Sequence, residues 1–434
     1  MLKRLGPSAV TAGAANPAAL FPSKLEFNPP AHGVWNIVHI GMLVPEAHQI
    51  YVCAVNCMRG VVLTAAEMGA QERFSCVILK EEDITRGTVE EITRQGIADV
   101  LRKLPKLPPC VIVFPVCTHH FLGVNMLGVY KALEREFPTV DFVRAYMDPI
   151  VRKRMPPDRR LRKVMYDPLP VCEPDAKRVL LCGSDFALDE ECDLRKLLAD
   201  GGYIYTDIQS CRTYAAYKEL AKAGHILSVY PAGEYGAQQL ALRLGRQHLH
   251  LPMSFSYEEI AAQERRLCEA LGIAEPDIGS EIASCDRAFA KAKRVIGDAP
   301  IAIDASVHPT PLGLARCLIE HGFRVTEVYL DAVGGEEAAL AWLRQNAPEV
   351  TLSSVVLPEL RVVSRERHDK TLAIGQKAAW FTGTPHFVNM VQGGGLWGFA
   401  GVRTMLRLMA EAWQTEKDTR DLVPRKGWGC ESCL

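Results

Sequence analysis

The chain has 434 residues, of which 48% are apolar and 23% are charged, and its net charge is −1. This length exceeds one ordinary hydrophobic core and predicts two to three domains. The balanced charge excludes a global attraction to nucleic acid or to a membrane surface, and no apolar run reaches the roughly 18 residues that a membrane span needs.

Residues 1–34 are rich in Ala and Pro and lack the compact apolar block and cleavage site of a secretory signal, so we expect an N-terminal extension and a cytoplasmic protein. Because thiols stay reduced in the cytoplasm, 14 cysteines suggest metal or redox chemistry for some of them. Seven lie in apolar segments without ligand-like spacing, and we expect ordinary core residues there: Cys110, Cys172, Cys182, Cys192, Cys268, Cys285 and Cys317.

Short β-rich runs alternate with longer segments of helical periodicity along the whole chain. The expected strands are 35–42, 75–79, 110–116, 141–147, 178–182, 203–208, 225–230, 248–251, 300–304, 324–330, 351–356, 371–374 and 386–390. This alternation predicts an α/β protein with parallel sheets and helices on both faces. We expect three domains, at 35–165, 166–294 and 295–425, and a C-terminal tail at 426–434.

Two segments between the expected strands suggest anion binding. Residues 152–163 hold seven basic side chains and one acid, Asp158, which is typical of a solvated face or of a wall around an anionic group. Residues 308–313, His-Pro-Thr-Pro-Leu-Gly, open a helix. The N-terminus of that helix could hold an anion, or the segment could be only a capped turn with proline in the first helical turn.

Cys53, Cys76 and Cys117 stand at loop-like positions of the first domain. Thiolates from three strand ends can converge on one side of a domain, but three cysteines cannot close a four-coordinate zinc site unaided. They could hold half of an iron–sulfur cluster whose other half a partner subunit binds. On spacing alone, three buried free cysteines are an equal alternative.

A resemblance to a known family favours the cluster. Residues 53–62 read Cys-Ala-Val-Asn-Cys-Met-Arg-Gly-Val-Val and resemble the first cysteine motif of nitrogenase molybdenum–iron protein subunits, Cys-Ala-x-x-x-x-(Lys/Arg)-Gly-Val-Val. Cys76 lies where the family has its second cluster cysteine, with Ser75 in place of the family's glycine, and Cys117 resembles the third. The resemblance runs from about residue 35 to residue 413.

The resemblance implies the family's three-domain fold and an [8Fe-7S] P-cluster, half of which Cys53, Cys76 and Cys117 would bind at the interface with a paralogous subunit. Cys57 is the substitute ligand if Cys76 is not one. The assembly would be an α2β2 heterotetramer. The chain shows no Gly-x-x-x-x-Gly-Lys-(Ser/Thr) phosphate loop, so a separate ATP-dependent iron protein would donate the electrons.

The family holds a second, substrate-reducing metallocluster with one Cys of the second domain and one His of the third. Residues 229–233, where the family's cysteine would stand, read Val-Tyr-Pro-Ala-Gly, so we assign this role to Cys211 in the preceding loop. The alternative is a cysteine packed at a helix start. His386, ahead of the glycine run 393–395, resembles the family's histidine ligand, and imidazole suits iron.

The chain departs from the nitrogen-fixing pattern, because the family's Gln-x-x-x-His pair is replaced by Tyr-Met-Asp-Pro-Ile at 146–150. It is more similar to the non-nitrogen-fixing branch, and to methylthio-alkane reductases first, which implies cleavage of carbon–sulfur bonds with release of methanethiol. The other readings are a metallocluster-assembly scaffold, a tetrapyrrole reductase subunit, or a metal-free α/β module of the periplasmic-binding or flavodoxin type. The tail pair Cys430 and Cys433 is too weak a signal to be assigned a role.

Overall fold

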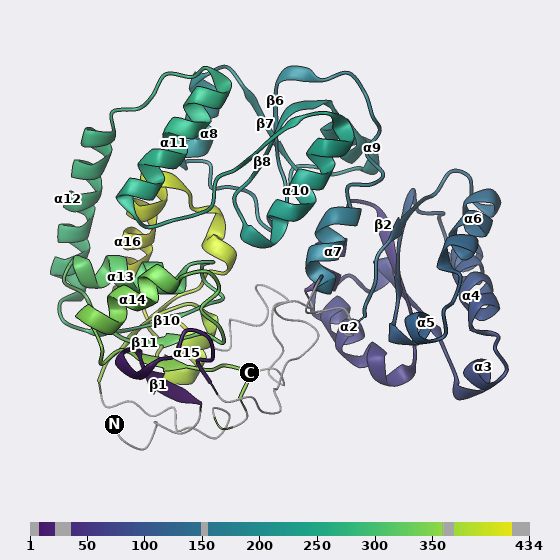
Figure 1. The fold of residues 1–434 in the computed structure, drawn as a ribbon, viewed down its shortest axis with the longest axis horizontal. Helices are drawn as coiled ribbons and strands as arrows, with labels where there is room; N and C mark the ends of the chain where they lie inside the picture. Colours follow the sequence, from purple (N-terminus) through teal and green to yellow (C-terminus); the bar gives the residue numbers. More distant parts are fainter. Residues whose placement is uncertain (1–7, 22–35, 149–154, 358, 360–368, 419–434) are drawn as a thin grey trace.

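The computed structural model describes residues 8–21, 36–148, 155–357, 359 and 369–418. Three sheets organise the chain into three lobes, and helix α7 (Pro157–Val164) lies between the first lobe and the second (Figure 1). The expected α/β class with parallel sheets is confirmed. In the described part of the chain, no helix is long and apolar enough to cross a membrane.

The first sheet has the order β3-β2-β4-β5, and all of its neighbours are parallel. Its strands are β2 (Ala47–Cys53), β3 (Phe74–Ile78), β4 (Cys110–Pro115) and β5 (Asp141–Arg144). The helices of this lobe are α1 (Ile37–Met42), α2 (Val55–Glu67), α3 (Glu81–Thr85), α4 (Val89–Lys103), α5 (Cys117–Phe121) and α6 (Met126–Glu136). Tyr51 and Cys53 share the face that packs on the α1, α2 and α7 side, whereas Ile50 and Val52 face the α4 and α6 side, as the two-residue period of a strand requires.

The expected strand at 35–42 is wrong, because Ile37–Met42 forms helix α1 and the strand follows at Ala47–Cys53. Five of the six residues of α1 are buried, so the segment lacks the periodicity of a surface helix and resembles a buried strand. The Arg73 guanidinium donates hydrogen bonds to the carbonyls of Met42, Val44 and Ala47, which satisfies acceptors at the end of α1.

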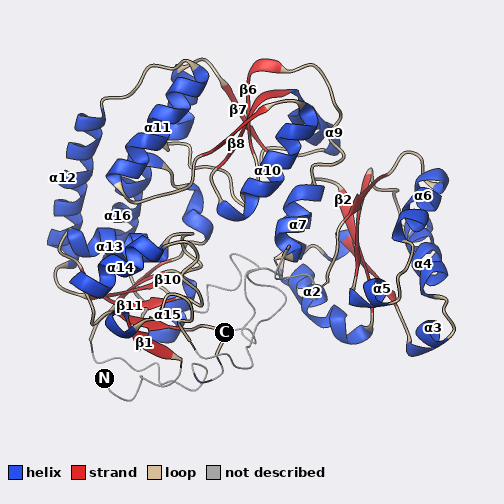
Figure 2. Cartoon of the chain, viewed as in Figure 1, coloured by secondary structure: helices blue, strands red, loops and turns tan. Residues whose placement is uncertain are grey.

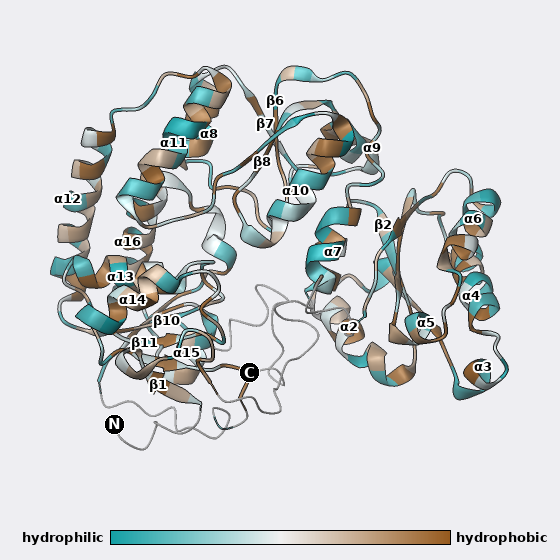
Figure 3. Cartoon of the chain, in the orientation of Figure 1, coloured by the Kyte–Doolittle hydropathy of each residue, from teal (hydrophilic) through white to brown (hydrophobic). Residues whose placement is uncertain are grey.

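The second sheet has the order β7-β6-β8-β9 and is also entirely parallel. Its strands are β6 (Asp175–Leu181), β7 (Ile204–Asp207), β8 (Ala223–Ser228) and β9 (Gln247–His250). Its helices, together with the two long ones that lead to the third lobe, are α8 (Asp193–Asp200), α9 (Tyr214–Lys218), α10 (Pro231–Leu244), α11 (Tyr257–Leu271) and α12 (Ile278–Ile296). Figure 3 shows apolar and polar turns alternating along α11 and α12, as expected for helices with one buried face.

The third sheet has the order β1-β12-β11-β10-β13-β14. Its strands are β10 (Pro300–Asp304), β11 (Arg324–Tyr329), β12 (Thr351–Ser353), β13 (Leu372–Ile374) and β14 (Phe387–Val388), joined by β1 (Ala9–Thr11) from the N-terminal segment, which pairs antiparallel with β12. The helices are α13 (Pro311–Glu320), α14 (Glu337–Asn346), α15 (Gln376–Thr382) and α16 (Gly398–Gln414) (Figure 2).

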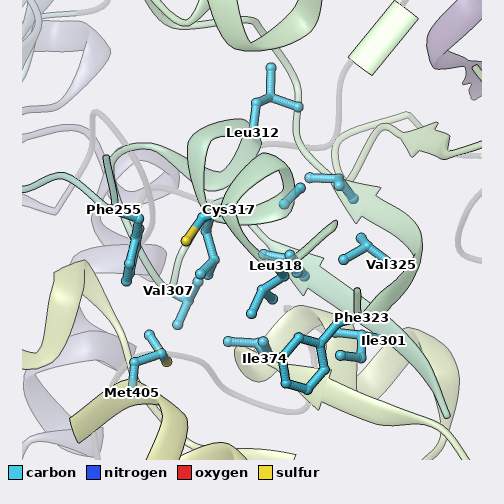
Figure 4. Close-up of a cluster of buried hydrophobic side chains, with 14 of the residues drawn as sticks. Phe255, Ile301, Val307, Leu312, Cys317, Leu318, Phe323, Val325, Ile374 and Met405 are labelled. Atoms are coloured by element: carbon cyan, nitrogen blue, oxygen red, sulfur yellow. The ribbon is translucent and has the colours of Figure 1, made fainter. Parts of the chain in front are cut away.

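The cysteines expected in cores lie largely where they were expected. Cys317 packs among Phe255, Val307 and Leu318 in the core of the third lobe (Figure 4). Six of the seven are buried, and Cys172 is partly exposed.

Candidate functional site

Cys53 and Cys76 lie side by side on the first sheet. Cys53 is the last residue of β2 and is fully buried. Cys76 pairs with Tyr51 in the parallel register of β2 and β3, so it lies inside its strand and on the same sheet face as Cys53. Only Cys53 of these two therefore ends a strand.

Cys57 and Cys117 extend this group across the carboxyl edge of the sheet. Cys57 is exposed in the first turn of α2, which follows β2, and the partly buried Cys117 is the first residue of α5, which follows β4. Since β2 and β4 are neighbours, the two helices start at the same edge. We name Cys53, Cys57, Cys76 and Cys117 the thiol edge.

The pKa shifts of these thiols reflect both their burial and their proximity to one another. The pKa of Cys53 is raised to about 12, first by burial and then by the neighbouring Cys76 and Cys57 thiols. Burial likewise raises the pKa of Cys76 to about 12, and the pKa of Cys57 is raised by burial and then by Cys117. The Cys53 and Cys76 thiols are thus protonated at neutral pH, so metal binding there must displace protons.

The donor set of the thiol edge is chemically suited to iron and sulfide, because cysteine thiolates are the usual protein ligands of iron–sulfur clusters. Within the described ranges, no three His, Cys, Asp or Glu side chains converge to hold a single metal ion. The thiols are spread over a strand end, a neighbouring strand and two helix starts, an arrangement that fits a polynuclear cluster better than one ion.

Several apolar side chains are exposed beside the thiol edge. Val55 and Leu63 of α2 are 60% and 44% exposed, and Phe121 at the end of α5 is 75% exposed. Leu122, the next residue, is 46% exposed. Figure 1 shows α2 and α5 at the same end of the first lobe. Apolar side chains gathered on one surface in this way commonly mark a protein–protein contact.

Cys211 lies at the contact between the first two lobes. Its thiol is partly buried and donates a hydrogen bond to the Asp207 carbonyl, 3.5 Å away, at the end of β7. Nearby, the backbone N–H of Tyr214 donates to the Glu46 carboxylate at 2.9 Å, and its hydroxyl donates to the Asp141 carboxylate at 2.7 Å. These bonds fix the Cys211 loop against the first lobe.

His386 lies at the amino end of β14, the edge opposite to the one at which parallel strands present ligands. Its Nδ1 is 3.1 Å from the Ala412 carbonyl, its Nε2 is 3.8 Å from the Glu416 carboxylate, and its ring packs on Trp413. The thiols of the thiol edge lie close enough to shift one another's pKa values, whereas Cys211 and His386 have separate surroundings, one against the first lobe and the other against α16.

The glycine run that follows β14 is a contact between lobes. The N–H of Asp189 donates to the Gly395 carbonyl at 3.0 Å. A Cβ atom on Gly395 would lie 2.3 Å from the Ala187 carbonyl oxygen, and its φ is +77°. Glycine is required here because the turn lies directly on the backbone of the second lobe.

Both expected anion sites contain acidic side chains of the chain itself. Glu336 accepts hydrogen bonds from the N–H groups of Leu312 and Gly313 at 3.2 and 2.6 Å, so its carboxylate occupies the N-terminus of α13. Arg162 of the basic run is 2% exposed and pairs with Asp185. The part of that run that the structure describes is therefore not simply a solvated face.

Asp185 joins all three lobes. Besides pairing with Arg162 of α7, its carboxylate accepts hydrogen bonds from the side-chain amides of Asn36 and Gln392, at 2.8 and 2.7 Å. Asn36 precedes α1, and Gln392 precedes the glycine run. Sequence reasoning missed these residues, since single polar side chains 149 and 207 positions from Asp185 carry no local motif. The Cys430 and Cys433 pair lies outside the described residues.

Comparison with known proteins supports the fold. No family model matches the chain, and no curated protein sequence matches it. Among solved structures it is similar to nitrogenase Cp1 at pH 6.5, with a TM-score of 0.65 and 12% identity over 92% of this chain and 96% of that chain. A chain of nitrogenase Cp1 at pH 5 gives a TM-score of 0.58 and 12% identity, with 94% of each covered. The chain thus has the fold of a nitrogenase subunit over nearly its whole length.

Proposed function

We propose that this chain is a subunit of a nitrogenase-like reductase, in which Cys53, Cys76 and Cys117 bind one half of a P-cluster-like [8Fe-7S] cluster. The observation that carries the proposal is the grouping of four thiols, with Cys53, Cys57 and Cys117 at the carboxyl edge of the first sheet and Cys76 inside the neighbouring strand β3, beside exposed apolar side chains. Cys57 belongs to the same thiol edge and is the substitute ligand.

The exposure of the thiols supports a cluster shared between subunits. Cys53 is buried, Cys76 and Cys117 are partly exposed, and Cys57 is exposed, so the thiol edge extends from the interior to the surface. A paralogous subunit that covered Val55, Leu63 and Phe121 would bring its own ligands to the open side and exclude water. We therefore propose a heteromeric assembly of the α2β2 type.

When bound, such a cluster would supply one-electron storage and transfer. The residues of this chain would hold it as thiolates and keep one side of it dry. Loading would move protons from Cys53 and Cys76 to solvent, because burial keeps both thiols protonated in the absence of metal. We propose an ATP-dependent iron protein as the electron donor.

A second metallocluster with Cys211 and His386 as ligands stays a prediction from the sequence. The two residues have separate surroundings, so each is tested singly, by the iron content of Cys211→Ser and of His386→Ala. Loss of the same iron from both variants would support a shared cluster. The second candidate is a tetrapyrrole reductase subunit, which needs no second cluster and would bind a pigment with visible absorption.

The reductase proposal is tested by turnover. The chain, its co-purified partner subunit and an iron protein are incubated under anaerobic conditions with ATP and a methylthio-alkane, and methanethiol is measured. The reductase account predicts ATP-dependent release of methanethiol, which is lost when the iron protein is omitted. A cluster-loaded assembly that passes iron to another apoprotein but reduces no substrate would instead identify a metallocluster-assembly scaffold.

A further inference from the structure

The thiol edge contains one cysteine more than the three that the proposed function assigns to the shared cluster. The additional one is Cys57, which is exposed, whereas Cys53 is buried and Cys76 and Cys117 are partly exposed. Cys57 can either replace one of the three ligands or bind iron beside them.

The strand register places Cys53 at the centre of the thiol edge. On β3, Cys76 lies two residues before the partner of Cys53 and on the same sheet face. On the other side, Val52 pairs with Pro115 of β4, so Cys117 lies one residue beyond the level of Cys53. With the usual spacing of strands and of residues along them, the Cα atom of Cys53 is about 8 Å from that of Cys76 and about 6 Å from that of Cys117.

Cys57 lies close to this centre, because the chain turns into α2 directly after Cys53. The N–H of Cys57 donates to the Ala54 carbonyl at 3.0 Å, in the first turn of the helix. The electrostatics agree with this position. Burial and then the Cys117 thiol raise the pKa of Cys57, and the Cys57 thiol contributes to the raised pKa of Cys53 after burial and Cys76. Cys57 is therefore a neighbour of thiols on both β2 and α5.

The exposure of the thiols indicates which side of a cluster each would face. Cys53 is buried and would bind from the interior, whereas Cys57 is exposed and would bind from the outer side. In a shared cluster the ligands of the partner subunit approach from that outer side. When the partner is absent, Cys57 is the exposed thiol available there. A [4Fe-4S] cluster takes four cysteine thiolates, and the thiol edge contains four.

We propose that Cys57 is a fourth ligand, with which the chain alone holds a complete [4Fe-4S] cluster before a paralogous subunit joins. The inference rests on the proposed function and deepens it, because the same thiol edge would first bind iron without a partner. Binding transfers no electron, since each thiol releases its proton to its surroundings and binds one iron as a thiolate. In the assembly the partner's ligands face the outer side, so Cys57 is dispensable there.

The test uses the full chain without its partner, purified in iron-free form under anaerobic conditions. It is mixed with a preformed [4Fe-4S] cluster whose ligands are small thiolates, which leave as thiols with the protons of the cysteines. Iron, sulfide and the EPR spectrum of the dithionite-reduced protein are measured after gel filtration. We expect about four iron and four sulfide per chain in the unmodified protein.

Three variants locate the ligands in this partner-free chain. Cys172→Ala is the control, because Cys172 lies outside the thiol edge, and it should take up the same iron as the unmodified chain. Cys57→Ala and Cys76→Ala should each lose iron and change the EPR spectrum. Since Cys57 is exposed, its replacement should leave the melting temperature unchanged. Full iron content with an unchanged spectrum in Cys57→Ala would overturn the inference. The same result in Cys76→Ala would show that Cys57 only replaces Cys76, and would also overturn it.

The assembly with the partner subunit separates this inference from the proposed function. There, Cys57→Ala should retain the iron of the unmodified assembly. A folded partner-free chain that takes up no iron, beside an iron-loaded assembly, would overturn the inference and leave the proposed function intact. Iron in neither form would overturn both.

Discussion

Glu264 of α11 is a buried acid whose replacement should make the protein more stable at alkaline pH. It is 1% exposed, so its carboxyl group is shielded from bulk water. Its pKa is raised to about 8, first by burial and then by the carboxyl groups of Asp193 and Glu281, while Arg403 acts in the opposite direction. Asp193, Glu281 and Arg403 belong to α8, α12 and α16, respectively. The contacts of Glu264 with them therefore join the second lobe to the third.

The direction of the pH effect follows from the raised pKa. A carboxyl group with a pKa of about 8 in the folded chain, against 4.5 for the ordinary side chain, takes up a proton on folding. Its contribution to stability is therefore fully present below pH 4.5 and is lost as the pH rises through about 8. Between pH 6 and pH 9 the free energy of unfolding therefore falls by about 3 kcal/mol. The loss is about 1.4 kcal/mol for each pH unit up to the pKa of the folded chain.

Glu264→Gln removes the titration and keeps the shape of the side chain. We expect its melting temperature to exceed that of the unmodified chain at pH 9 by several degrees and the difference to shrink toward pH 6. Scanning calorimetry from pH 6 to pH 9 measures this. The control is Glu269→Gln, because Glu269 is an exposed acid on the same helix. Its melting temperature should equal that of the unmodified chain at every pH. If the melting temperature of Glu264→Gln also equals that of the unmodified chain at every pH, the Glu264 carboxyl group does not titrate as argued.

Two further substitutions test the contacts between the lobes. Asp185→Ala leaves its buried guanidinium partner without a counter-charge and should cost about 3–5 kcal/mol in chemical denaturation, whereas Glu190→Ala, whose side chain is 89% exposed, should cost less than about 0.5 kcal/mol. Equal effects would mean that the Arg162–Asp185 ion pair does not stabilise the contact between the lobes. Gly395→Ala should increase the rate of proteolysis between the second and third lobes more than Gly297→Ala does, because both glycines have positive φ but only Gly395 has backbone within 2.3 Å of the added Cβ. A larger effect at Gly297 would contradict the close contact.

The regular part of the fold could be read from local patterns. Strands such as Pro300–Asp304 and Arg324–Tyr329 are short β-rich runs bounded by turns, and alternation with helices fixes a parallel sheet. The pattern failed at Ile37–Met42, because a helix buried on most sides has no polar stripe to reveal its period. β1 could not be predicted, since pairing of Ala9–Thr11 with Thr351–Ser353 depends on residues more than 300 positions apart.

The candidate site was predictable only where a motif is local. The segment that contains Cys53 and Cys57 has a recognisable spacing, and strand order then places Cys117 at the same edge. His386 sits beside a glycine run, but whether that run supports a ligand or a contact between lobes depends on what packs against Gly395. Local sequence does not contain this information.

The central claim is that the thiol edge binds an iron–sulfur cluster. It is tested most directly by iron and sulfide analysis of the chain, purified under anaerobic conditions with its partner subunit, in the unmodified form and as Cys117→Ala and Cys172→Ala. Both cysteines are partly exposed, but Cys172 lies outside the thiol edge. The account predicts iron and sulfide in the unmodified and Cys172→Ala proteins and their loss in Cys117→Ala. Full iron content in Cys117→Ala, or an unmodified assembly without iron, would contradict it.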